Sequence, residues 1–292
     1  MRLGCFEIIG PLPELKSPHA IATLRPWIDA GNVGTLTLER MEKHFGAVDL
    51  GSVAKPGTFF DFTRYRPMMF NREGNREIAI PNSTISFAKR ENGNDFVFLH
   101  LLEPHMFSET YITSVLLVIK MLGVRSYSLL GSMYDSVPHT RPLLITGGAM
   151  GNNPSKLEAL GIRPGHRYQG PTTICHLITQ EAAHLGLETM SLMIHLPQYT
   201  ELENDYTGEL ALLQILSILY DFPVGEVEKH KAEKQYAEID EVVKANRKLK
   251  SALAQLEASY DARAESRKED LPQLSSEVEN FLKEMENRFG PT

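Results

Sequence analysis

Residues Phe96–Leu102 form a nearly continuous apolar run that is interrupted only by His100. A strand that is apolar on both faces must be covered on both sides, which is typical of a sheet enclosed between two helical layers. Similar runs at Ala20–Trp27, Ser126–Leu130 and Thr189–Leu196 alternate with stretches of helical spacing. The sequence therefore predicts an α/β fold with a mainly parallel sheet that is covered on both faces.

Helices are predicted between these strands, because apolar residues there recur at steps of three and four. The segments concerned are Thr35–Phe45, Ser108–Leu122, Thr173–Leu185 and Tyr206–Leu219. Ser108 is expected to be an N-cap, because its hydroxyl can accept a hydrogen bond from a free amide in the first turn. The 292 residues are enough for one large α/β domain, which we place at residues 1–225, and for an extension.

The composition of the chain changes near Gly225. Of its 67 charged residues, 27 lie in the last 67 positions, and the two signs are mixed as on a solvated helix. One face of the predicted helix carries mostly apolar residues at steps of three and four, which we call the seam. The seam residues are Ile239, Val242, Asn246, Leu249, Leu253, Leu256 and Tyr260. After an expected break at Asp270–Pro272, the spacing resumes at Leu274, Val278, Phe281 and Met285. Residues 226–292 are therefore predicted to form a charged helical hairpin.

The apolar face of this hairpin has two possible uses. It forms either a coiled coil between subunits, in which Asn246 fixes the register, or a hairpin that lies on the α/β domain. In the first case residues 226–292 are an association arm.

Bulk properties exclude several classes of partner. The net charge of −7 gives no ground for a nucleic-acid or anionic-membrane partner. No apolar run reaches the roughly 18 residues that a membrane span needs. Met1–Gly10 lacks the basic and apolar segments of a secretory leader, and the distant Cys5 and Cys175 suit a reducing compartment. We therefore expect a cytoplasmic protein.

The segment Val137–Pro142 holds His139, Thr140 and Arg141 between two prolines. Proline fixes its own φ and restricts the residue before it, so this loop is expected to be stiff. It lies between two predicted core strands. Such a loop is either part of a binding site or a brace in which Arg141 pairs with a buried carboxylate.

The binding-site alternative includes other side chains at strand ends. Asp29 and Glu103 each follow a predicted strand directly, and Asp61 lies in a Phe-Asp-Phe segment. In open α/β sheets, ligands bind outside the carboxyl ends of the strands. With His139 and Arg141, these carboxylates form a candidate cleft for a phosphorylated or carboxylated metabolite.

A second candidate is a glycine-containing segment, Gly147, Gly148 and Gly151, which precedes a helix predicted to begin at Pro154 with Asn153 as its cap. Backbone amides there could bind an anion, or the glycines could simply allow a tight turn. The segment lacks the Gly-Lys-Ser/Thr ending of a P-loop. No cofactor is predicted, and no metal site is expected, because the chain lacks His-Glu-x-x-His and Cys-x-x-Cys patterns.

Several motifs together resemble one known family. They are Trp27–Gly31, Phe60–Phe62 with Arg66-Pro67, Glu103-Pro104, Pro138–Pro142, Gly170–Thr172 and Leu196–Tyr199. Over roughly residues 20–223, the chain resembles the proteasome assembly chaperone 2-like family of archaea and bacteria. The resemblance implies a three-layer α/β/α sandwich similar to nucleoside phosphorylases and related hydrolases, and self-association, often as a ring.

Two functional hypotheses follow. The first is a cytoplasmic, self-associating interaction protein of the assembly-chaperone type, a trimer or larger ring, with a possible further protein partner. The second is an enzyme or ligand-binding protein that acts on a nucleoside or a phosphorylated or carboxylated metabolite. Because unrelated functions share this fold, the resemblance itself implies no reaction.

Overall fold

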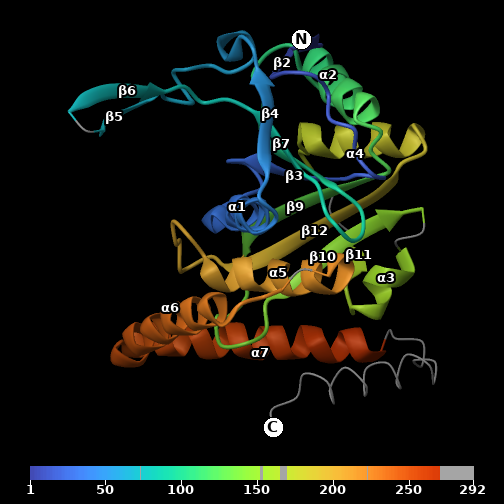
Figure 1. Cartoon of the computed structure of the whole chain (residues 1–292). Coiled ribbons are helices and arrows are strands. Elements are labelled where there is room, and N and C mark those ends of the chain that lie inside the picture. Colours follow the sequence, from blue (N-terminus) through green and yellow to red (C-terminus); the bar gives the residue numbers. More distant parts are fainter. Residues whose placement is uncertain (73, 152–153, 165–169, 222, 270–292) are drawn as a thin grey trace.

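A mixed ten-stranded sheet forms the centre of the molecule (Figure 1), with the strand order β1-β2-β4-β7-β8-β3-β9-β12-β10-β11. The computed structural model describes residues 1–292 except 73, 152–153, 165–169, 222 and 270–292. The strands of this sheet are β1 (Arg2–Leu3), β2 (Phe6–Ile8), β3 (His19–Arg25), β4 (Val48–Val53), β7 (Thr84–Ala88), β8 (Phe96–Leu102), β9 (Ser126–Asp135), β10 (Leu144–Met150), β11 (Arg163–Pro164) and β12 (Glu188–Pro197).

The sheet is parallel at its centre and mostly antiparallel outside it. Strands β8, β3, β9 and β12 pair in parallel, with Ala22 opposite both Leu99 and Leu129. Strands β1, β2, β4 and β7 join one side through antiparallel pairs, and β10 joins the other side antiparallel to β12. The buried runs predicted from the sequence are the parallel strands, since parallel strands need cover on both faces.

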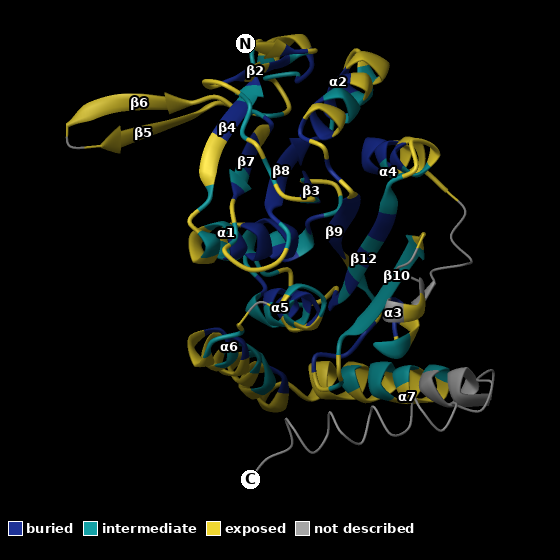
Figure 2. Ribbon diagram, turned by 45° about the vertical axis from the view of Figure 1, so that its right-hand side comes forward, coloured by how far each residue is buried: buried dark blue, intermediate teal, exposed yellow. Residues whose placement is uncertain are grey.

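Helices cover both faces of the sheet, which confirms the predicted three-layer α/β/α architecture. One face carries α2 (Ser108–Met121) and α4 (Ile174–His184). The other carries α1 (Val33–Phe45), α3 (Pro154–Ala159) and α5 (Tyr206–Tyr220). Strand β3 contributes Ala20, Ala22 and Leu24 to the first core and Ile21 to the second, and these residues are fully buried (Figure 2). Two short 3-10 helices, η1 (Ala30–Asn32) and η2 (Pro56–Thr58), complete the body.

The start of α2 differs from the prediction. The N-cap is Phe107, with φ 55° and ψ 41°, and Ser108 is the first helical residue. The chain after β8 is held by Phe59, whose carbonyl accepts hydrogen bonds from the amides of His105 and Met106. The Phe107 ring packs on the Phe59 ring, and these tertiary contacts place the helix start one residue earlier than the serine signal.

Helix α6 (Glu226–Ala245) packs on the α/β body beside α5. Ala232 and Val243 of this helix are buried. The Tyr236 hydroxyl donates to Asp205, the N-cap of α5, at 3.0 Å, and Glu228 pairs with Arg40 of α1 at 2.5 Å. Helix α6 is therefore joined to the body by apolar and polar contacts.

Asn246 separates α6 from α7 (Arg247–Glu269), so the prediction of one continuous seam through this residue was wrong. Its backbone is extended, with φ −119° and ψ 110°. Its side-chain oxygen accepts from the amides of Lys248 and Leu249, at 3.0 and 3.3 Å, and so caps α7. Asparagine favours a cap over a helix interior. The predicted break at Asp270–Pro272 and the apolar positions after it lie outside the described residues.

A two-stranded hairpin projects away from the body between β4 and β7 (Figure 1). It consists of β5 (Met68–Arg72) and β6 (Asn75–Ala79), which pair with each other in antiparallel register. All ten of its strand residues are exposed, whereas the central strands of the main sheet are buried (Figure 2). We refer to residues 68–80 as the arm.

Candidate functional site

The five predicted cleft residues occupy separate positions along the carboxyl edge of the sheet. Asp29 and Glu103 each bind the start of a different helix. Asp61 lies on the surface near the root of the arm. His139 and Arg141 contact α6 and α7. The structure therefore brings His139 and Arg141 together, and each of the three carboxylates has partners of its own.

Asp29 is buried and stabilises the start of α1. Its Oδ1 accepts from the amides of Gly34 and Thr35, at 2.7 and 3.2 Å, and its Oδ2 accepts from the Thr35 hydroxyl at 2.6 Å. A Cβ at Gly34 would lie 2.3 Å from the Thr23 hydroxyl, so glycine permits this close approach. Burial raises the pKa of Asp29, while these hydrogen bonds act in the opposite direction. Both carboxylate oxygens are engaged, and the residue has a structural role.

Glu103 has a comparable role at α4. Its Oε1 accepts from the amide of Ile174 at 3.1 Å, and its backbone carbonyl accepts from the Tyr65 hydroxyl at 3.0 Å. Burial raises the pKa of Glu103. A carboxylate at a helix N-terminus also compensates the positive end of the helix dipole.

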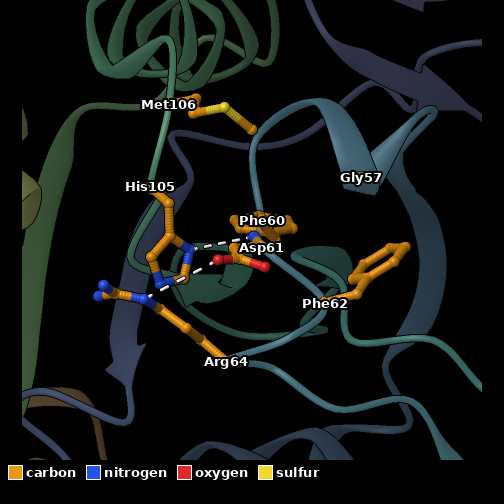
Figure 3. Close-up of a pocket in the computed structure, with 7 residues that line it drawn as sticks. All are labelled: Gly57, Phe60, Asp61, Phe62, Arg64, His105 and Met106. Carbon is orange, nitrogen blue, oxygen red and sulfur yellow. Dashed lines mark hydrogen bonds and ion pairs between the residues drawn. The ribbon is translucent and has the colours of Figure 1, made fainter.

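Asp61 lines a surface cavity of about 470 Å³ (Figure 3). The His105 ring and the Arg64 side chain lie beside it, with His105 Nδ1 accepting from the Asp61 amide at 3.2 Å and Arg64 Nε 3.9 Å from Oδ2. Hydrogen bonds from Thr63 lower the pKa of Asp61. Phe60, Phe62 and Met106 complete much of the wall, so the cavity combines an ion pair with apolar surface.

His139 is buried against Tyr199, which follows β12. The Tyr199 hydroxyl accepts from the His139 amide at 2.8 Å and lies 2.5 Å from its Nδ1, which leaves Nε2 to carry the ring proton. Nε2 lies 3.8 Å from Asp240 of α6, and the ring meets Tyr236 edge to face. Burial lowers the pKa of His139, although Asp240 and Glu257 oppose this effect. The histidine is thus an interior residue between the loop and α6.

Arg141 pairs with carboxylates, but the predicted brace with a buried carboxylate is not formed, because the side chains of Arg141, Glu257 and Asp261 are 34%, 27% and 51% exposed. The guanidinium binds both oxygens of Asp261, at 3.0 and 2.9 Å, and Glu257 at 3.2 Å. Thr140 donates to the same Glu257 at 2.6 Å. The partners are carboxylates of α7 and not those of the predicted cleft.

The predicted anion-binding loop is a strand over most of its length, and this expectation is corrected. Gly147 and Gly148 lie inside β10, opposite Leu192 and Ser191 of β12. A Cβ at Gly147 would lie 2.5 Å from the Ser191 carbonyl, so close strand packing accounts for this glycine. Gly151 follows the strand with φ +87°, which glycine adopts readily. Helix α3 begins at Pro154 as expected, and Asn153 lies outside the described residues.

Comparison with known protein families shows which family the chain belongs to. The model of the PAC2 family matches residues 23–245, which is most of the sequence. The chain belongs to the PAC2 family. Among solved structures, it is similar to a Mycobacterium tuberculosis protein of unknown function, Rv2714, at 27% identity and a TM-score of 0.79, covering 92% of each chain.

Two further PAC2 neighbours share the fold. A PAC2 family protein from Streptomyces avermitilis is 24% identical, with a TM-score of 0.70 over 80% of this chain and 99% of that one. The Mycobacterium tuberculosis proteasome-assembly chaperone homologue Rv2125 is 23% identical, with a TM-score of 0.71 and the same coverage. A search of curated proteins found no match.

One arrangement in this PAC2 protein was missed from the sequence. His195 of β12 lies between Asp135 of β9 and Thr146 of β10, with Nδ1–Oδ2 and Nε2–Oγ1 distances that are both 2.9 Å. This order of hydroxyl, imidazole and carboxylate is that of a catalytic triad. The register of three strands creates it, and no sequence spacing reveals it.

Within the part of the chain that the structure describes, the triad-like arrangement lacks the amide donors that an acyl-transfer site also needs. Such chemistry needs amide donors aimed at the developing oxyanion. The strand around Thr146 is paired on both sides, with β12 and with β11. The geometry therefore supports a polar cross-strand network.

The described ranges contain no group of three His, Cys, Asp or Glu side chains placed to hold a metal ion. Among the helices of the same residues, none is long and apolar enough to cross a bilayer.

Proposed function

We propose that this PAC2 protein is a cytoplasmic, self-associating interaction protein with a chaperone-like role, and that its arm joins it to further copies of itself. One observation carries the proposal: the strands of the arm are exposed at every described position and carry the large apolar side chains of Met68, Met69, Phe70 and Ile78. Family membership supports the chaperone-like role, since a fold neighbour is a proteasome-assembly chaperone homologue. The assembly we propose is a trimer or larger ring.

The apolar side chains of the arm occur on both of its faces. Successive residues of a strand point to opposite sides, so Met68 and Phe70 share one face while Met69 shares the other with its cross-strand partner Ile78. Met69 and Ile78 are 61% and 62% exposed. A ribbon that is apolar on both faces needs a covering surface on each side.

A two-stranded sheet is at best marginally stable in water by itself. Contiguous exposed apolar surface on a soluble chain usually marks a protein-binding site. Outside the arm, apolar side chains also reach the surface at Met106 and Phe62, which line the cavity of Figure 3. Phe107, next to Met106, is also exposed.

A second copy is the partner that we assign to the arm. The outer edges of β5 and β6 pair with no other described strand, so the arm of another copy can extend this small sheet. Each arm has one free edge on β5 and one on β6, so β5 of one copy can pair with β6 of the next, and such head-to-tail contacts can close into a ring.

Light scattering of the full chain tests the proposal. We expect the mass of three or more copies, and we expect the double substitution Phe70→Ser and Ile78→Ser to reduce it. Ile218→Ser is the matched control, because Ile218 is an exposed aliphatic residue of α5 outside the arm. A wild-type mass of one chain, or an arm variant with unchanged mass, would overturn the proposal.

The chaperone-like role has a separate test. Purified proteasome core subunits are mixed with the wild-type chain and with the arm variant. Binding to the wild-type chain supports the role, and binding lost in the arm variant would place the partner on the arm. Lack of binding to the subunits would remove the chaperone-like part and leave self-association standing.

A further inference from the structure

Helix α7 is attached to the molecule differently from every helix of the sandwich. Over residues 247–263, where its side chains are described, none is buried. Leu253, Leu256 and Tyr260 are half-buried at most. By contrast, α6 buries Ala232 and Val243. Apolar burial therefore contributes much less to the docking of α7 than to that of α6.

Polar contacts from the loop 136–142 hold α7 in place instead. Besides the bonds of Thr140 and Arg141 to Glu257 and Asp261, the Tyr260 hydroxyl donates to the Pro142 carbonyl at 2.8 Å, and Arg263 donates to the Ser136 carbonyl at 2.7 Å. All of these contacts fall within two turns of the helix. We call this set the latch.

The ionic part of the latch is open to solvent. The side chains of Arg141, Glu257 and Asp261 are 34%, 27% and 51% exposed. Ion pairs in such positions contribute little to stability, and salt screens them over a Debye length of about 8 Å at physiological ionic strength. The latch is therefore weak and sensitive to salt.

Asn246 has the geometry of a hinge next to this latch. Its extended backbone interrupts the helical hydrogen bonds between α6 and α7. Its side chain caps α7 through the amides of Lys248 and Leu249, so the cap remains when α7 turns as a unit. Because most helical stability in proteins comes from tertiary packing, an undocked α7 is expected to fray and to lose amide protection even though its cap remains.

A groove lies beneath α7, with a volume of about 540 Å³. Its walls come from α6, α7 and the segment after β12. The apolar residues in these walls include Leu202, Ile239, Val242, Leu249, Leu253 and Leu256. These are mostly the residues of the predicted seam, now facing one another across the hinge. Movement of α7 would widen this groove.

From the latch, the hinge and the groove, we propose that α7 is a strap that opens about Asn246 when salt or a competing charge releases Arg141. Closed, the strap covers one side of the apolar groove. Open, it exposes the groove while α6 stays on the body. The proposal is independent of the arm, because the arm shares none of these residues.

Hydrogen exchange measured by mass spectrometry tests the strap. Raising the salt concentration should speed exchange in α7 peptides, and Arg141→Ala should do so at low salt, because both raise the open population. Loss of two exposed pairs predicts an increase of about threefold to tenfold. Peptides of α5 and α6 should exchange at unchanged rates.

Lys229→Ala is the matched control, because Lys229 pairs with Glu226 on the surface of α6 at 2.8 Å, away from the latch. It should leave α7 unchanged. Asp261→Ala, a second latch variant, should also speed exchange in α7 but by less, because Arg141 keeps its pair with Glu257, and circular dichroism checks that each variant is folded.

Three results would overturn the strap. The first is α7 exchange that responds neither to salt nor to Arg141→Ala. The second is an equal acceleration of α5, α6 and α7, which would mean that the helices open together. The third is an unprotected α7 in the wild-type chain at low salt, since no closed state would then exist.

Discussion

The bond between Tyr236 and Asp205 gives a direct test of how α6 is joined to the body. Tyr236→Phe keeps the ring and removes only the hydroxyl that donates to Asp205 Oδ2 at 3.0 Å. Asp205 is 1% exposed, and burial raises the pKa of both residues. The substitution takes one hydrogen bond from a carboxylate that solvent does not reach.

The expected cost follows from the charge and burial of the acceptor. Hydrogen bonds to charged groups contribute about 1.5–3 kcal/mol, so Tyr236→Phe should lower the free energy of unfolding by about 2 kcal/mol. Tyr260→Phe is the matched substitution on α7, where the hydroxyl donates to the neutral Pro142 carbonyl at a half-exposed position. It should cost less than about 1 kcal/mol.

Urea unfolding followed by circular dichroism measures both effects, with the slope of the transition expected to stay constant. In an Asp205→Ala background, Tyr236→Phe should have almost no further cost, because the acceptor is already absent. A change below about 0.5 kcal/mol for Tyr236→Phe alone would refute the reasoning. That result would favour the predicted division of the chain into an α/β domain at residues 1–225 and a separate unit at residues 226–292. This domain boundary remains a prediction.

Two further substitutions test the interior. Burial lowers the pKa of His139 in the folded chain below its value in the unfolded chain. As the pH drops, the unfolded chain is therefore protonated at this residue before the folded chain, and the free energy of unfolding should fall below about pH 6.5. His139→Gln should flatten this dependence in unfolding experiments between pH 5 and 8, and an unchanged slope would contradict it. Gly147→Ala should destabilise the sheet by about 1–3 kcal/mol, because its Cβ would clash with the Ser191 carbonyl. Gly148→Ala, whose nearest contact would be 3.7 Å away, should be nearly neutral, and equal costs would rule out the clash.

The central sheet could be predicted from the sequence because its signal is local. Phe96–Leu102 is buried at every position, so its composition alone indicates cover on both faces. The arm gave no such signal, since its ten strand residues are all exposed and its apolar residues stand next to one another in Met68–Phe70 and Ile78–Ala79. A strand that packs on no core has no apolar periodicity to detect.

The candidate site was harder to predict, because its partners are distant in sequence. The loop Val137–Pro142 was correctly expected to lie between two strands, although β10 is half-buried and not a core strand, and Arg141 meets Asp261, 120 positions away. Glu257 and Asp261 stand four residues apart on one helical face, and this spacing was the available signal. The seam residues were identified correctly as apolar, but Asn246 occupies a seam position and also caps a helix, so periodicity did not reveal the turn.

The two weakly supported segments lie at different ends of the molecule. The arm projects beside β4, and α7 lies beneath α5 at the opposite end, in both views (Figures 1 and 2). Energetic effects at distant sites that share no partners are usually additive. If arms join the copies of the proposed assembly, the strap and groove of each copy remain outside that contact. If both proposals hold, the surface that joins the copies and the salt-sensitive groove beneath α7 are separate parts of each chain.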